Sequence, residues 1–163
     1  ATVFQTLYNL EGRPVPASAS VLTDEGWASD SASSAFADVV GTWYDLSANW
    51  AYETGLTQGT GAGFQGDRDI TRAELVVILE RYAKYKNADM TAGNDVELLT
   101  NYADAELLTT WSVDAFQWAV GAQVILGKTS PAGNLLAPGQ NATRAELAQI
   151  LENFTDFFTR SAQ

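Results

Sequence analysis

The chain has 163 residues, of which 46% are hydrophobic and 11% aromatic, so it can build a packed core and is not expected to be disordered. Its net charge of −11 argues against nucleic acid as a partner, and no apolar run approaches the roughly 18 residues that insertion into a membrane needs. The absence of cysteine and histidine excludes disulfides and Cys/His zinc sites, and removes the commonest general base near neutral pH.

The chain opens on a short helical pattern that also occurs later in the sequence. Residues 1–10 overlay the run from Ala73 to Tyr82, with Val3 on Leu75 and Leu7 on Leu79. We therefore expect a helix that ends a truncated first repeat, whose preceding part has been removed. The alternative is an ordinary N-terminal helix that matches by chance. The Ser-, Ala- and Pro-rich stretch that follows has little periodicity and is interpreted as a linker, with a short helical turn near Thr23 to Trp27.

The first complete copy of the repeat predicts two helices joined by a long loop. Its first helix carries Trp43 near its start and Trp50 on its apolar stripe, and a glycine-rich loop begins at Gly59. The tetrapeptide Thr-Arg-Ala-Glu at 71–74 has the pattern of a capping box, and apolar residues at helical spacing follow it. These signals predict a second helix that ends near Lys86.

A second copy repeats these features in the same order. Its opening Tyr-Ala-Asp, its tryptophan pair seven residues apart, its glycine and its Thr-Arg-Ala-Glu lie at 102–104, 111 and 118, 127, and 143–146. A brief helical turn is expected within the connection, at 96–100. The predicted boundaries are 1–11 for the truncated first repeat, 12–34 for a linker, 35–86 for the second repeat, 87–101 for another linker and 102–158 for the third repeat. Since one helix pair cannot bury its own apolar face, the copies must pack together.

This pattern resembles the S-layer homology (SLH) domain. The residues that carry the resemblance are Phe36-Ala37-Asp38-Val39, Trp43, Gly59, Phe64 and Ile70-Thr71-Arg72-Ala73-Glu74. It covers about 100 residues in two near-complete copies plus the N-terminal remnant. The second copy departs from the pattern, since Ala105 and Ala142 replace the expected Val and Ile and its loop is longer.

The resemblance implies an all-α fold of tandem helix–loop–helix repeats packed as a pseudo-threefold helical bundle. It implies a secreted module at the bacterial cell surface that binds an anionic, pyruvylated secondary cell-wall polysaccharide and so anchors a protein without a covalent bond. The ligand would lie in grooves between neighbouring repeats. Carried over by position, the ligand-binding candidates are Asp38, Trp43, Gly59 and Arg72 in one copy and Asp104, Trp111, Gly127 and Arg144 in the other.

The two arginines also point to a ligand on physical grounds. Each stands at the first turn of a helix, where the macrodipole disfavours a cation by roughly 0.3–1 kcal/mol. A carboxylate bound there would receive helix amides and the guanidinium fork together. The alternative is pairing with the protein's own acids, Asp67 or Asp69 for Arg72 and Glu146 or a distant acid for Arg144.

The remaining candidates each have a structural alternative. Lys128 directly follows Gly127 and would add charge to the groove, or else is a solvated loop lysine. Trp50 and Trp118 are assigned to the core, whereas Trp43 and Trp111 fit a core or a ligand role equally well. No EF-hand loop occurs, and neither a metal nor a cofactor is predicted.

Catalysis is not expected. Without histidine or cysteine, an enzyme would need paired carboxylates or a Ser–Lys dyad, and the acids are scattered while no serine has a lysine in a patterned context. The main competing hypothesis is a processed, secreted SLH fragment that acts as a ligand or inhibitor of another protein. The predicted partner is therefore a cell-wall polysaccharide or another protein.

Overall fold

The computed structural model describes residues 1–23 and 26–161 and is mostly helical, with 45% of residues in helices and 10% in strands. Its α-helices are α1 Thr2–Leu10, α2 Asp45–Glu53, α3 Arg72–Tyr85, α4 Val113–Gly121 and α5 Arg144–Ser161. Three short 3₁₀ helices lie between α3 and α4, at Thr91–Asn94, Val96–Asn101 and Ala105–Leu107. The second of these confirms the expected helical turn at 96–100.

The prediction of an all-α fold is confirmed only in part, because two antiparallel hairpins interrupt the helices. One pairs β1 (Val21–Thr23) with β2 (Gly26–Ala28), and the other pairs β3 (Lys128–Ser130) with β4 (Gly133–Leu135). The expected helical turn near Thr23 to Trp27 is therefore wrong, and two of its residues, 24 and 25, lie outside the described part. The second hairpin lies in the loop of the second copy and accounts for its greater length.

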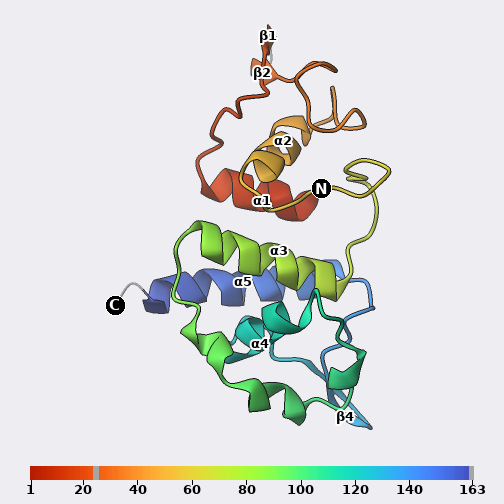
Figure 1. The fold of residues 1–163 in the computed structure, drawn as a ribbon, viewed down its shortest axis with the longest axis vertical. Helices are drawn as coiled ribbons and strands as arrows, with labels where there is room; N and C mark the ends of the chain where they lie inside the picture. Colours follow the sequence, from red (N-terminus) through yellow and green to blue (C-terminus); the bar gives the residue numbers. More distant parts are fainter. Residues whose placement is uncertain (24–25, 162–163) are drawn as a thin grey trace. The chain divides into compact units, whose positions relative to one another are not determined.

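Two compact units make up the chain, Ala1–Arg68 and a second one that starts at Asp69. In the first unit, α1 packs on α2 (Figure 1). The rings of Tyr8 and Trp50 are centred 5.7 Å apart across this contact. Phe4 and Phe64 add a second ring contact at 5.3 Å, and Leu7 is fully buried. The predicted helix at the start of the chain and the core position of Trp50 are confirmed.

Polar side chains of α2 hold the segment that precedes it. The buried Asp45 accepts hydrogen bonds from the backbone N–H and the hydroxyl of Ser29, and the fully buried Asn49 accepts from the N–H of Ala35 at 2.8 Å. Glu53 accepts from the N–H groups of residues 17 and 18, both at 2.9 Å. The stretch predicted as a linker is thus fixed to α2 at several points.

In the second unit, α3 and α5 lie side by side and α4 packs against them (Figure 1). The ring of Phe154 lies 5.7 Å from that of Tyr82 and 6.3 Å from that of Trp118, so one α5 residue joins all three helices. Trp118 is buried, as predicted. The division between the units falls inside the predicted repeat 35–86, because its second helix shares a core with the next copy.

No helix in the described ranges 1–23 and 26–161 has the length and apolar character to cross a bilayer. The pseudo-threefold packing of the repeats stays a prediction.

Candidate functional site

In each copy of the repeat, an aspartate holds the loop that precedes the second helix. Asp38 accepts hydrogen bonds from the N–H groups of Phe64 and Gln65, at 3.0 and 2.8 Å. Asp104 accepts from those of Leu136 and Ala137, at 2.7 and 2.8 Å. Asp38 and Asp104, both predicted to bind a ligand, therefore accept hydrogen bonds from the protein's own backbone. Asp38 is exposed; the desolvation that remains raises the pKa of its carboxyl, but these backbone hydrogen bonds together outweigh it and lower the pKa.

The two predicted glycines are required by the same loops. Gly59 and Gly127 have φ values of +69° and +81°, in the region that side chains disfavour. A Cβ at Gly127 would stand 2.5 Å from the ring of Tyr102, and one at Gly59 would collide with the ring of Phe36. Each glycine lets the loop approach the aromatic residue that opens its copy.

Both predicted capping boxes are present. Thr71 accepts from the N–H of Glu74 while Glu74 accepts from the N–H of Thr71, and Thr143 and Glu146 make the same two bonds at 3.2 and 2.9 Å. The caps fix where α3 and α5 begin, and so place Arg72 and Arg144 at the first helical position, as predicted.

Arg72 reaches from α3 into the next copy of the repeat. The residue is only 3% exposed, and its Nε donates to the carbonyl oxygen of Leu136 at 2.8 Å. That carbonyl belongs to the loop that Asp104 holds. Burial lowers the pKa of Arg72, and the carboxylates of Glu146 and Asp104 oppose this shift. The ordinary pKa of arginine lies far above neutral pH, so the guanidinium stays charged despite this shift.

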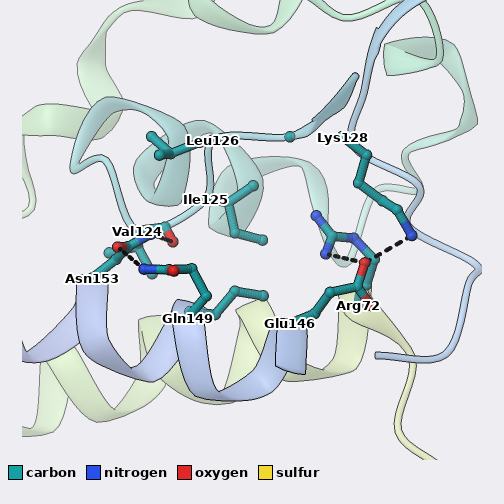
Figure 2. Close-up of a pocket in the computed structure, with 10 residues that line it drawn as sticks. Arg72, Val124, Ile125, Leu126, Lys128, Glu146, Gln149 and Asn153 are labelled. Carbon is teal, nitrogen blue, oxygen red and sulfur yellow. Dashed lines mark hydrogen bonds and ion pairs between the residues drawn. The ribbon is translucent and has the colours of Figure 1, made fainter. Parts of the chain in front are cut away.

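The guanidinium of Arg72 faces a pocket of about 410 Å³, within the range of roughly 300–1,000 Å³ that small-molecule sites occupy. Figure 2 shows Arg72 and Lys128 on either side of the Glu146 carboxylate, with the apolar Ile125 beside them. The pocket combines an apolar wall from one loop with charged and amide groups from two helices. Its lining residues are Arg72, Val124, Ile125, Leu126, Gly127, Lys128, Glu146, Gln149, Ile150 and Asn153.

Glu146 is the carboxylate that both pocket cations face. Its Oε1 lies 2.7 Å from the Lys128 Nζ and 3.6 Å from an Nη of Arg72 (Figure 2). The hydrogen bond from Lys128, followed by that from the Thr143 N–H, lowers the pKa of Glu146 to about 2. The acid that faces Arg72 is thus Glu146 rather than the predicted Asp67 or Asp69, and Asp69 accepts a hydrogen bond from Asn141 at 3.2 Å. The pairing distance to Arg72 exceeds that of a hydrogen bond, and the pocket stays open beside it.

The other predicted site residues lie outside this pocket. Trp43 and Trp111 are 66% and 56% exposed, and each precedes its helix rather than opening it, because α2 begins at Asp45 and α4 at Val113. Arg144 is exposed at the start of α5. Among the described residues that line the pocket, only Arg72, Gly127 and Lys128 were predicted from the sequence.

Sequence reasoning missed Glu146, Gln149 and Asn153, which all lie on one face of α5. From the sequence, Glu146 was predicted only to cap α5 or to pair with Arg144, and nothing in the sequence indicated that its second carboxylate oxygen would face Arg72 and Lys128. Asn153 donates to the carbonyl of Val124 at 3.2 Å, and so ties α5 to the loop that bears Lys128. Leu126, which lines the pocket, is exposed while Val124 and Ile125 beside it are buried, and the sequence did not indicate this difference.

The repeated helix–loop–helix elements define a helical repeat module, and its second unit carries the cation-lined pocket. Residues 35–76 match the family model of the S-layer homology domain, which is a binding and anchoring domain and is not catalytic. A curated relative, the amylopullulanase of Thermoanaerobacterium thermosulfurigenes, is 30% identical over 121 residues, which are 71% of this chain and 6% of the relative. The chain thus covers a small part of that relative's length. No solved structure gives a significant match.

The matched domain is also known for where its proteins are found and what it binds. Proteins with this domain are associated with the cell surface and the cell wall, and the domain binds cell-wall polysaccharide in general. The match suggests cell-wall anchoring.

Proposed function

We propose that this chain anchors a secreted bacterial protein to the cell wall by binding an anionic, pyruvylated secondary cell-wall polysaccharide in the Arg72 pocket. The observation that carries the proposal is the guanidinium itself. It is buried at a helix start, held from behind by the Leu136 carbonyl, and turned toward an open pocket that also holds Lys128.

The chemistry of a pyruvyl ketal suits this arrangement. Its carboxylate would accept from the guanidinium of Arg72 and the ammonium of Lys128, and hydrogen bonds between charged groups are the stronger kind. The sugar ring that bears the ketal would lie against the apolar wall of Ile125 and Leu126. Specificity for the charged sugar follows, since an uncharged sugar leaves both cations without a ligand carboxylate.

The remaining site candidates belong to the same proposal. Trp43 and Trp111 are exposed and offer flat apolar faces to further sugar units, and Arg144 offers an exposed cation at a helix start. Asp38, Gly59, Asp104 and Gly127 would act by holding the loops that shape the sites. The proposal includes the packing of the repeats as a pseudo-threefold helical bundle.

Cosedimentation with purified wall sacculi tests this function. The wild-type chain should pellet with sacculi and should fail to pellet once mild acid has removed the ketal groups. Lys128→Gln should weaken pelleting by about 10-fold, from the loss of one charge-assisted bond of roughly 1.5 kcal/mol. Arg81→Gln, at an exposed position of α3, removes the same charge outside the pocket and is the matched control.

Arg72→Ala should abolish pelleting, with circular dichroism used to verify the fold because the side chain is buried. Equal pelleting of wild type before and after ketal removal would contradict the proposal. A wild-type chain that does not pellet at all would favour the competing hypothesis of a protein-binding fragment, which stays a prediction.

A further inference from the structure

We propose that Glu146 is a built-in competitor for the anion site, a carboxylate that occupies the two pocket cations in the free protein and limits how tightly an external carboxylate binds. This inference rests on the proposed function in one respect, that it concerns the same pocket. It makes Glu146 a residue that tunes affinity rather than one that contributes to binding.

The two carboxylate oxygens of Glu146 make different contacts. Oε2 accepts from the backbone N–H of Thr143 at 2.9 Å and so closes the capping box. Oε1 faces the cations, 2.7 Å from Lys128 and 3.6 Å from Arg72. The side chain of Glu146 is 22% exposed, so the carboxylate lies at the mouth of the pocket rather than in the core. It occupies the cations as a ligand carboxylate would.

Both cations have a second anchor that does not depend on Glu146. Arg72 donates through Nε to Leu136, and Lys128 donates to the side-chain oxygen of Gln140 at 3.0 Å. Asp104, the other acid near Arg72, is committed to two backbone N–H groups. Neutralising Glu146 should therefore leave both cations in place. Their positive charges would then lack the carboxylate that balances them in the wild-type chain.

The capping box supplies a substitution that separates charge from structure. Glutamine caps a helix at this position as glutamate does, so Glu146→Gln keeps the bond to the Thr143 N–H and removes the negative charge. Glu74 closes the equivalent box of α3, with its Oε2 accepting from the Thr71 N–H at 2.9 Å, and it does not line the pocket described here. Glu74→Gln is therefore a matched control for any effect on helix capping.

The experiment measures the affinity of wild type, Glu146→Gln and Glu74→Gln for sodium pyruvate at constant ionic strength. The Arg72 Nε–H and Gly127 amide signals in ¹⁵N NMR spectra report binding at this pocket. The same three proteins are also titrated with wall sacculi. We expect Glu146→Gln to lower the pyruvate Kd about fivefold, as expected for removing a like charge about 4 Å from the ligand in water. Glu74→Gln should leave the pyruvate Kd unchanged, and the sacculus affinities should follow the same order.

The two proposals fail in distinguishable ways. The competitor role is overturned if Glu146→Gln binds pyruvate with unchanged or weaker affinity than wild type. It is also overturned if neither wild type nor Glu146→Gln shows saturable shifts with pyruvate. In either case, pelleting of wild type with sacculi would still support anchoring. Tighter pyruvate binding by Glu146→Gln together with no pelleting of any protein supports the competitor role and overturns the wall ligand. An equal gain in Glu74→Gln would also overturn the competitor role, because the gain would then come from helix capping.

Discussion

Replacing Asp104 by asparagine tests whether this carboxylate holds the loop whose carbonyl positions Arg72. Asp104 is 8% exposed and accepts two backbone hydrogen bonds, from the N–H groups of Leu136 and Ala137. The carbonyl of that same Leu136 holds Arg72. Asparagine keeps one acceptor oxygen, but its amide group would point an N–H at the other backbone N–H.

The magnitude follows from burial. Losing one hydrogen bond to a charged group and leaving one buried N–H unsatisfied should cost about 2–4 kcal/mol of unfolding free energy. Asp38 makes the equivalent pair of bonds in the first unit but is exposed, so water replaces the lost bond. Asp38→Asn should therefore cost only about 0.5–1.5 kcal/mol.

Urea unfolding and amide hydrogen exchange measure both effects. Because the chain has two units, exchange of the amides of Leu136 and Ala137, and of Phe64 and Gln65, assigns each loss to its own loop. Asp104→Asn should also weaken binding of sacculi and pyruvate, since Arg72 loses a fixed acceptor. If Asp104→Asn unfolds within 0.5 kcal/mol of wild type and its loop amides exchange no faster, the holding role assigned to this carboxylate is incorrect.

Three further predictions concern the same unit. Gly127→Ala should destabilise it by about 1–3 kcal/mol, measured by urea unfolding, because a positive φ and the nearby ring of Tyr102 both oppose a Cβ; a neutral effect would contradict this. Phe154→Ala should cost about 3–5 kcal/mol in the same assay, since the ring is buried between three helices, and a loss under 1 kcal/mol would show that the core closes without it. The pKa of Glu146 is lowered to about 2 in the folded chain, so its charge stabilises the fold fully above its ordinary pKa near 4.5, and this contribution is lost as the pH falls toward 2. Thermal melts from pH 6 to 2 should show Glu146→Gln losing less stability than wild type, by on the order of 1 kcal/mol after solvent screening, and parallel curves would contradict the lowered pKa.

Much of the local structure was predictable from the sequence because its causes are local. The two Thr-Arg-Ala-Glu tetrapeptides predicted where α3 and α5 begin, since a capping box needs only residues within one turn. The spacing of apolar residues predicted the buried faces, including Trp50 and Trp118. The starts of α2 and α4 were misplaced by two residues, because no side chain caps either helix in the structure.

The pocket depended on contacts between residues far apart in the chain. Arg72 donates to a carbonyl 64 positions later, and its carboxylate partner follows by 74 positions, so no spacing within one copy could indicate either. The sequence alone determined that arginine would stand at a helix start with its charge in need of an anion. Only the tertiary structure decided that the first anion there is Glu146, because packing α3 against the next copy brings a capping carboxylate and a loop lysine to the same guanidinium.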